Sequence, residues 1–199
     1  MFSGIIKTLG RVESIEIKGT TKAFTISSSI SSMLQVDQSI SHDGACLTIV
    51  QVDQQTHTVE VVLETLSKTT FGQLQEGQLL NLERSISSNT LLDGHLVQGH
   101  VDATLYCLDK EDLTGSWKFR FNLPEEFKGL VIPQGSICIN GVSLTVADLE
   151  ENSFCVAIIP YTYEHTTFKY LEKGVPVNVE FDVIGKYIIR QMELRNLTE

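Results

Sequence analysis

The sequence predicts an all-β protein made of two tandem, homologous β-barrels with short helices, followed by a C-terminal α-helix. Three observations support this fold class. One part of the chain repeats at a constant offset, short β-branched stretches alternate with polar breaks in both halves, and the last segment carries apolar residues at helical spacing.

The repeat fixes the domain organisation. Ser39–Thr48 reads SISHDGACLT and Ser136–Thr145 reads SICINGVSLT, an offset of 97 residues (136 − 39 = 97). The same offset carries Thr65 onto Thr162, Gly77 onto Gly174, Asn81 onto Asn178 and Glu83 onto Glu180. Copies of about 90 to 100 residues are whole domains rather than solenoid turns. We therefore expect an N-terminal barrel over residues 1–97 and a C-terminal barrel over residues 98–187.

Short apolar stretches in each half are typical of strands in a small barrel. In the first half these are Ile5–Ile6, Ala23–Ile26, Leu47–Val52 and Thr58–Leu63. In the second half they are Ile137–Ile139, Leu144–Ala147, Phe154–Ile159 and Val177–Glu180. Short helices are expected after Thr65, after Pro124 and after Thr162. The serine-rich segment Ser27–Ser32 reads as a solvated bend.

The tail of the chain is predicted to be helical from near residue 183. Ile184, Tyr187, Ile188 and Met192 recur at helical spacing, with charged residues between them. Residues 188–199 form the end of this helix. It can pack on its own barrels, or it can bundle with copies from other subunits.

The composition indicates a cytoplasmic protein without nucleic-acid or membrane partners. The net charge is −10, so the basic face that phosphate contacts require is missing, and an anionic membrane surface is not attractive. The first residues lack the long apolar region of a signal peptide, and no stretch approaches eighteen apolar residues. The four cysteines share no metal-like spacing.

The most informative local motif is a turn glycine followed by a strand, present in both copies. Gly44–Thr48 and Gly141–Thr145 each allow a positive φ and the close approach of a flat ligand to the backbone. A single copy would be read as an ordinary turn, whereas two copies beside the pair Thr65 and Thr162 favour a binding site.

Two histidines follow in the junction between the repeats. His95 and His100 are five residues apart and face opposite sides of an extended segment, which argues against a shared metal. A histidine in such a loop is more often structural, although a role as base or proton shuttle stays open.

These residues resemble the riboflavin synthase family of the two-barrel type. The resemblance rests on the opening MFSGII, the GxCLT and GxSLT turns, the junction GHLVQGHVD of residues 94–102, the HTT of residues 165–167 and the tail DVIGKY of residues 182–187. It runs over essentially the whole chain.

The resemblance implies a fold and an activity. The fold is two six-stranded Greek-key barrels, each binding one lumazine. The activity is a transferase reaction in which one 6,7-dimethyl-8-ribityllumazine gives a four-carbon unit to another, yielding riboflavin and 5-amino-6-ribitylamino-pyrimidinedione. The family uses no metal or organic cofactor and forms a homotrimer through the C-terminal helices, with lumazine synthase as a further candidate partner. The reacting pair meets between the N-terminal barrel of one subunit and the C-terminal barrel of a neighbour.

The resemblance also implies site residues. Cys46, Thr48 and His100 would line the N-terminal site, with Gly4, Ile5, Ile6, Glu64 and Thr65 around the ligand. Ser143, Thr145, Ile159 and Thr162 would line the C-terminal site. Further substrate-binding positions are Ser39, Leu47, Glu60, Val61, Val62, Leu63, Gly99, Val101, Gln134, Leu144, Ala157, Ile158, Pro160 and Tyr161. Proton transfer is assigned to His100 or a substrate hydroxyl, polarisation or positioning to Cys46 and Ser143, and a place near the reacting pair to Asp182.

Three departures from the family pattern and two alternative functions remain. Ala45 replaces a residue that is larger in some members. Asp43 and Gln134 stand where the family commonly has Asn and Lys, and the second copy keeps Asn140. The alternatives are a non-catalytic lumazine- or flavin-binding protein, like the lumazine protein of luminous bacteria, and a scaffold without ligand. The second barrel of lumazine protein has a degraded motif, whereas both motifs are intact here, so the sequence favours the enzyme.

Overall fold

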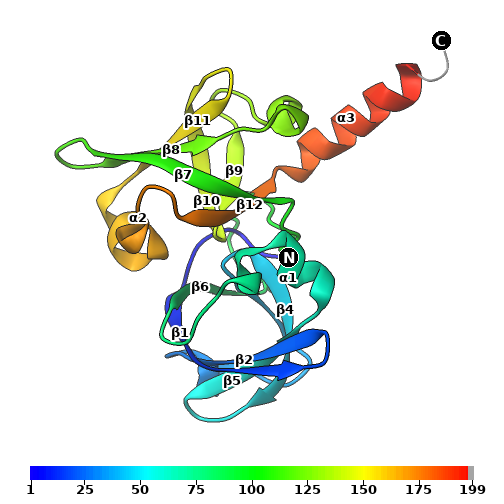
Figure 1. Ribbon diagram of the computed structural model, residues 1–199, viewed down its shortest axis with the longest axis vertical. Helices are drawn as coiled ribbons and strands as arrows, with labels where there is room; N and C mark the ends of the chain where they lie inside the picture. The colour runs from blue at the N-terminus through cyan, green and yellow to red at the C-terminus, as the bar shows by residue number, and fades with distance from the viewer. Residues whose placement is uncertain (197–199) are drawn as a thin grey trace.

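The protein, described by a computed structural model over residues 1–196, consists of two closed six-stranded antiparallel barrels and a projecting C-terminal helix (Figure 1). The order around the N-terminal barrel is β1-β2-β5-β4-β3-β6, and β2, β5, β4 and β3 form a Greek key. This confirms the predicted fold class. Residues 197–199 of the predicted tail lie outside the described residues.

The strands of the N-terminal barrel are β1 (Thr8–Lys18), β2 (Thr21–Ser27), β3 (Ser39–His42), β4 (Ala45–Val52), β5 (Thr56–Val61) and β6 (Leu79–Arg84). Those of the C-terminal barrel are β7 (Ala103–Asp112), β8 (Trp117–Asn122), β9 (Ser136–Ile139), β10 (Val142–Leu149), β11 (Ser153–Ile158) and β12 (Pro176–Phe181). The helices are α1 (Leu63–Lys68), α2 (Pro160–His165) and α3 (Val183–Asn196), with 3-10 turns η1 (Ser31–Met33), η2 (Thr70–Gly72), η3 (Glu125–Leu130) and η4 (Thr167–Tyr170).

Five predictions of strands and helices were wrong in part, and one of them is the predicted strand Phe154–Ile159, which ends at Ile158. Ile5–Ile6 precedes β1 and is not in a strand, and the predicted strand Thr58–Leu63 ends at Val61. The helices expected after Thr65 and Thr162 begin two residues before them, at Leu63 and Pro160. Proline at the first helical position starts α2 because its fixed φ suits a helix and its missing N–H needs no partner there.

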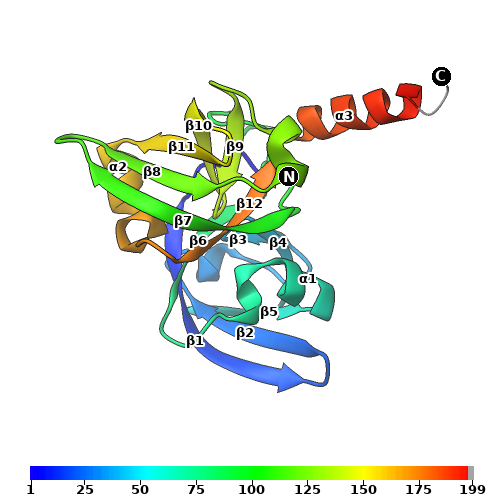
Figure 2. The same cartoon turned by 45° about the horizontal axis from the view of Figure 1, so that its top comes forward.

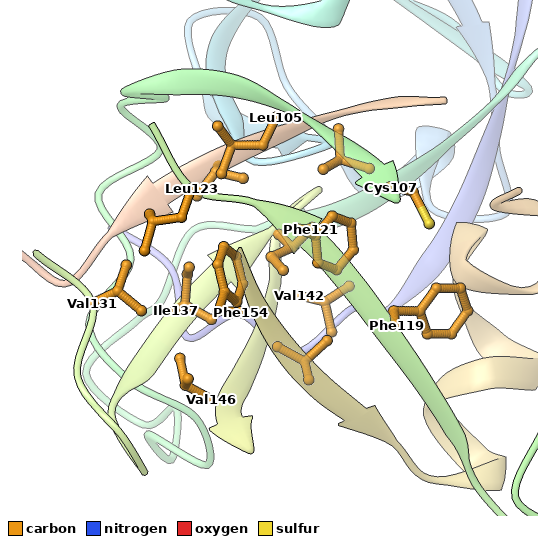
Figure 3. Close-up of a cluster of buried hydrophobic side chains, with 14 of the residues drawn as sticks. Leu105, Cys107, Phe119, Phe121, Leu123, Val131, Ile137, Val142, Val146 and Phe154 are labelled. Atoms are coloured by element: carbon orange, nitrogen blue, oxygen red, sulfur yellow. The ribbon is translucent and has the colours of Figure 1, made fainter. Parts of the chain in front are cut away.

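The C-terminal barrel has an apolar core built from inward-facing residues of its strands (Figure 3). Phe119, Phe121, Phe154 and Phe181 are almost fully buried, and the rings of Phe121 and Phe154 stack with centroids 5.6 Å apart. Each such ring stabilises the fold by about 1.5–3 kcal/mol relative to an exposed one.

The N-terminal barrel buries a histidine pair in its core. The Nε2 atoms of His42 and His57 lie 2.8 Å apart, His42 Nδ1 lies 3.3 Å from the Ile40 carbonyl oxygen, and His57 Nδ1 lies 3.1 Å from Ser31 Oγ. A carbonyl only accepts, so His42 donates from Nδ1, His57 donates from Nε2, and Ser31 donates to His57. Burial lowers the pKa of both histidines, so both rings are neutral, and this donor assignment is the one that two neutral rings allow. Ser31 is fully buried, so the reading of Ser27–Ser32 as a solvated bend was wrong at this residue, while Ser29 and Ser32 are exposed.

A reciprocal set of side-chain amides joins the barrels. Asn178 Nδ2 donates to the Asp43 carbonyl at 2.9 Å, and Asn81 Nδ2 donates to the Asn140 carbonyl at 2.8 Å. The turns themselves touch, because a Cβ added to Gly44 would lie 2.9 Å from the Gly141 nitrogen. The two turn motifs thus start from a common contact between the barrels.

Helix α3 leaves the C-terminal barrel and projects away from both barrels (Figure 2). Its first turn is anchored by Lys186, whose Nζ lies 2.7 Å from Asp102 Oδ1. Ile184, Tyr187, Ile188 and Met192 are more than half exposed, so the apolar stripe does not pack on the barrels of its own chain. In residues 1–196 no helix combines the length and apolar character needed to cross a membrane.

Candidate functional site

A pocket of about 300 Å³ opens at the glycine turn of the N-terminal barrel. Strand β4, helix α1 and the junction between the barrels all contribute to it. Its lining residues are Ala45, Cys46, Glu64, Thr65, Lys68, Thr69, Gly99, His100 and Val101. The structure thus brings together six predicted site residues: Cys46, Glu64, Thr65, Gly99, His100 and Val101.

The junction closes this pocket through a backbone contact. The Gly99 carbonyl accepts a hydrogen bond of 2.8 Å from the Cys46 amide. Gly99 has φ +85°, and a Cβ there would lie 2.5 Å from Cys46 Cβ, so only glycine fits.

Glu180, in β12 of the C-terminal barrel, holds the junction in place. Its carboxylate accepts the amide hydrogens of Gln98, Gly99 and His100 at 2.7, 2.8 and 2.8 Å. Burial raises the pKa of Glu180, and these three hydrogen bonds, which favour the ionised form, oppose the rise.

The C-terminal barrel has the same arrangement, made by the N-terminal segment. The Gly4 carbonyl accepts a hydrogen bond of 2.8 Å from the Ser143 amide, and Gly4 has φ +76°. Glu83, in β6 of the N-terminal barrel, accepts from the Ser3 amide, the Ser3 hydroxyl and the Gly4 amide at 2.7, 2.6 and 2.9 Å. Burial raises the pKa of Glu83, against these bonds.

This geometry corrects one assignment. Gly4, Ile5 and Ile6 were expected around the N-terminal site, but Gly4 lies against Ser143, and Ile6 packs on the core of the C-terminal barrel. The segment that enters one barrel therefore runs over the site of the other barrel. Their predicted contact with a ligand becomes a proposal for the C-terminal site.

His95, which the sequence analysis discussed but assigned to neither site, lies in the candidate C-terminal site. Its Nδ1 lies 2.7 Å from Ser143 Oγ, and Gly94 packs directly over the Ser143 side chain. Burial lowers the pKa of His95, while the negative charge of Asp182 acts to raise it. A neutral imidazole here can take the Ser143 proton. The repeated Gly-His dipeptide at residues 94–95 and 99–100 was the available signal.

The other predicted residues fall into three groups. Side chains of Leu47, Val61 and Ile158 are buried in the barrel cores, so only their backbones are open to a ligand. Glu60 points to the outer surface, where it pairs with Lys18 at 3.0 Å, and Gln134 occupies an exposed turn with φ +61°. Exposed or half-buried positions near the turns and helix starts are Ser39, Thr48, Val62, Leu63, Leu144, Thr145, Ala157, Ile159, Pro160, Tyr161 and Thr162.

A second cleft, of about 380 Å³, is lined by residues of both barrels. It contains Asp43 and Asn140 but none of the predicted site residues. The smaller pocket is the better candidate because it holds a thiol, an imidazole and two threonines beside the first residues of β4.

The cysteine in the pocket is more exposed than the other three cysteines. Cys46 is half-buried, while Cys107, Cys138 and Cys155 are buried, and burial raises the pKa of each of those three thiols. Within residues 1–196 no group of three His, Cys, Asp or Glu side chains is placed to hold a metal ion.

Known proteins resemble this chain in sequence along almost its full length. A family model described as lumazine binding domain matches twice, over residues 3–85 and 98–182. Riboflavin synthase of Bacillus amyloliquefaciens is 36% identical over 191 residues, covering 96% of this chain and 89% of that protein. Riboflavin synthase of Mycobacterium tuberculosis (strain ATCC 25618 / H37Rv) is 37% identical over 201 residues, covering 96% and 98%.

Solved structures share the fold. LumP in complex with riboflavin superposes with a TM-score of 0.85 at 22% identity, covering 92% of this chain and 100% of that chain. LumP in complex with 6,7-dimethyl-8-(1'-D-ribityl) lumazine gives 0.83 at 21% identity, covering 92% and 99%.

Proposed function

Because the chain belongs to the riboflavin synthase family and contains two lumazine-binding domains, we propose that it catalyses the dismutation of 6,7-dimethyl-8-ribityllumazine. In this transferase reaction one lumazine gives a four-carbon unit to a second one. The products are riboflavin and 5-amino-6-ribitylamino-pyrimidinedione. Atoms balance between the two substrates, so the scheme needs no further reactant.

One observation carries the proposal. Each barrel presents the same hydrogen-bonded turn, with Cys46 in one and Ser143 in the other, covered by a glycine carbonyl from a crossing segment. Two equivalent hydrogen-bonded turns in one chain suit a reaction that consumes two copies of one substrate. The backbone groups of each turn would form hydrogen bonds with the edge of the heterocycle, and α1 and α2 would flank the ring.

The chemistry asks little of the protein beyond orientation. The lumazine ring is electron-poor, so its 7-methyl protons are already acidic, and holding two rings face to face lowers the barrier by proximity. One ring loses a methyl proton and the other accepts the resulting nucleophile. His95, paired with Ser143, and His100, in the pocket with Cys46, are the proton-transfer groups of the two sites. Asp182 acts on His95 through its charge.

The proposed assembly is a homotrimer through α3. The exposed stripe of Ile184, Tyr187, Ile188 and Met192 supports it, because four large apolar side chains on a projecting helix are stabilised when another helix covers them. The reacting rings would then meet between the N-terminal barrel of one subunit and the C-terminal barrel of its neighbour.

The test is incubation of the purified chain with the lumazine while the flavin absorption band is followed. The proposal expects one riboflavin for every two lumazines consumed, with heat-denatured protein as the control. Tight binding without turnover would instead support the lumazine-protein type of function. The absence of both binding and turnover would support a scaffold without ligand. For the proton-transfer role of His100, unchanged turnover in His100→Gln would exclude it.

A further inference from the structure

Two segments, here called the straps, cross from one barrel to the site of the other. The first strap is residues 2–6 and leads into the N-terminal barrel; the second is residues 97–101 and leads into the C-terminal barrel. They pair with each other at one point, where the amides of Phe2 and Val97 exchange hydrogen bonds of 2.7 and 3.1 Å with the opposite carbonyls. Beyond this point each strap runs over the opposite barrel.

Each strap contacts the site of the barrel that it does not enter. The carbonyl of Gly4 takes the amide hydrogen of Ser143, and the carbonyl of Gly99 takes that of Cys46. Both contacts are close packed, because a Cβ on either glycine would lie 2.5 Å from the Cβ of the residue it faces. A small displacement of a strap therefore changes the shape of the site beneath it.

Each strap is held by one buried carboxylate, and that carboxylate belongs to the barrel that the strap enters. Glu83 and Glu180 are both 2% exposed. Three donors of the first strap converge on Glu83, and three backbone amides of the second converge on Glu180. None of these bonds goes to Ser143 or Cys46 directly, so the hydrogen bonds of the two glutamates reach the sites through the straps. Within its own barrel each glutamate is one strand further from the site residue, with Ser41 between Glu83 and Cys46 and Cys138 between Glu180 and Ser143.

We propose that Glu83 and Glu180 are crossed positioning residues for the two lumazine sites. Glu83, in the N-terminal barrel, shapes the C-terminal site, and Glu180, in the C-terminal barrel, shapes the N-terminal site. This inference deepens the proposed function and rests on it. Each barrel thereby sets the geometry of the site in its partner barrel, which keeps the two sites matched to each other.

Replacement of either glutamate by glutamine tests whether the position of the strap depends on the charge and on the number of acceptor oxygens. A carboxylate offers two acceptor oxygens to the converging amides, whereas the side-chain amide of glutamine offers one oxygen and turns an NH2 group towards another N–H donor. The strap must then move away from at least one of its bonds. Volume and burial stay nearly constant, so the substitution changes the number of acceptors and not the packing.

The experiment compares Glu83→Gln and Glu180→Gln in the full chain by amide hydrogen exchange and by riboflavin binding. The matched control is Glu76→Gln, since Glu76 also accepts a backbone amide hydrogen, from Ile15 at 3.1 Å, but on an exposed surface. In Glu83→Gln we expect exchange of the Ser143 amide to accelerate at least tenfold while that of Cys46 stays within twofold of wild type. Glu180→Gln is expected to give the mirror result.

Riboflavin binding adds a readout specific for the two sites. Cys46 is the half-buried thiol, so its protection from alkylation by bound riboflavin reports the N-terminal site, and a Cys46→Ser/Ser143→Cys variant reports the C-terminal site. Glu83→Gln should weaken riboflavin at least tenfold at the C-terminal site alone, and Glu180→Gln at the N-terminal site alone. Ser3→Ala, which removes one hydrogen bond to Glu83, gives a milder version of the first result if Glu83→Gln does not fold.

Three outcomes would overturn the crossed arrangement. They are an effect of each substitution on the site of its own barrel, equal effects on both sites, and no effect on the exchange of either amide. A purely structural role of the glutamates predicts equal effects and is overturned by the crossed pattern. Failure of the wild-type chain to form riboflavin would remove the proposed function, while the exchange rates of the Ser143 and Cys46 amides would still decide the crossed positioning.

Discussion

The two barrels share their strand order and their turn motif but differ in their interiors. Where the N-terminal barrel has His42 and His57, the C-terminal barrel has Ile139 and Phe154, at the same offset and opposite equivalent positions of the neighbouring strands. The histidine pair stabilises the N-terminal barrel through a chain of hydrogen bonds, whereas Ile139 and Phe154 stabilise the C-terminal barrel through apolar packing. A barrel core can thus exchange packing for a fully satisfied polar pair without changing its fold.

The two sites differ as well, although their backbones match. The N-terminal site has a thiol and an exposed imidazole in an open pocket, while the C-terminal site has a hydroxyl bonded to a half-buried imidazole and covered by Gly94. In the proposed dismutation one substrate copy loses a methyl proton and the other accepts the nucleophile. The two sites would then need the same turn backbone to hold a lumazine but different proton transfers from His100 and His95.

The most severe test of the core comparison is Phe154→His, which copies the first barrel into the second. The new imidazole would face Ile139 and the phenyl ring of Phe121, with no counterpart of the Ser31 and His42 partners. Lost packing and an unpaired polar group should together lower the free energy of unfolding by about 4 kcal/mol. Urea unfolding followed by the emission of Trp117, the single tryptophan and a residue of this barrel, measures it.

Phe154→Leu serves as the control for that experiment, because it removes volume without adding polarity. We expect it to cost less than half as much. A loss below about 1 kcal/mol for Phe154→His would mean that the apolar core supplies an imidazole partner, contrary to the packing observed.

Acid should affect the two barrels differently. Burial lowers the pKa of His57 to about 4, and burial and then repulsion from His57 lower that of His42 well below its usual value. The unfolded chain therefore binds more protons below pH 6.5, so the N-terminal barrel loses stability from about pH 6.5 down to pH 4, by on the order of 3 kcal/mol for His57 alone, and His42 adds to the loss in the same direction. Hydrogen exchange resolved by barrel across this pH range measures the loss.

The double variant His42→Ile/His57→Phe, which copies the second barrel, isolates this effect. Its N-terminal barrel should keep its stability across the same window, apart from the titration of other groups common to both proteins. Parallel loss of stability in wild type and variant would assign the acid sensitivity elsewhere.

The comparison of the two sites is sharpened by His95→Gln. Because His95 is bonded to Ser143, its loss should lower kcat for riboflavin formation about 100-fold, the usual range for one acid–base group. His165→Gln is the matched control, since that histidine is exposed and bonds only to a backbone carbonyl in α2. Steady-state rates at saturating lumazine measure both, and equal rates for wild type and His95→Gln would confine His95 to a structural role.

The sequence predicted the barrels because both copies preserve the turn glycines and the apolar alternation of the strands. It did not predict the crossed straps. Gly4 and Gly99 are 95 residues apart (99 − 4 = 95), whereas Glu83 and Glu180 are 97 apart (180 − 83 = 97), so a search at one offset misses the equivalence of the straps. Ile5–Ile6 read as a strand because two β-branched residues fit a strand locally, and only the tertiary contact with the other barrel decides otherwise.

The buried histidine pair was visible in the sequence only as a contrast between the copies. Histidine at residues 42 and 57 aligns with isoleucine and phenylalanine at the repeat positions, which marks both histidines as inward-facing. Their mutual bond depends on the pairing of β4 with both β3 and β5, which no local pattern specifies.

The smallest expected effect concerns the turns themselves, where Asp43 stands opposite Asn140. Each side chain accepts an amide hydrogen at 2.7 Å, Asp43 from Asn81 and Asn140 from Asn178. Burial raises the pKa of Asp43 to about 8, against the hydrogen bond from Asn81. The folded protein therefore keeps a proton that the unfolded chain releases above its ordinary value near 3.8, and stability falls as pH rises from about 4 to 8.

Asp43→Asn removes this titration and makes the two turns alike. The wild-type carboxyl can relieve part of the cost by facing the cleft between the barrels, which Asp43 lines, so we expect a gain of about 1 kcal/mol at pH 7.5 and almost none at pH 4. Urea unfolding at both pH values measures the difference. Asn140→Asp should produce the opposite change over the same pH range, because it places a second titrating carboxyl at the equivalent turn. If neither variant alters the pH dependence of stability, the turns are hydrated and the barrels meet less tightly than the contact of Gly44 with Gly141 indicates.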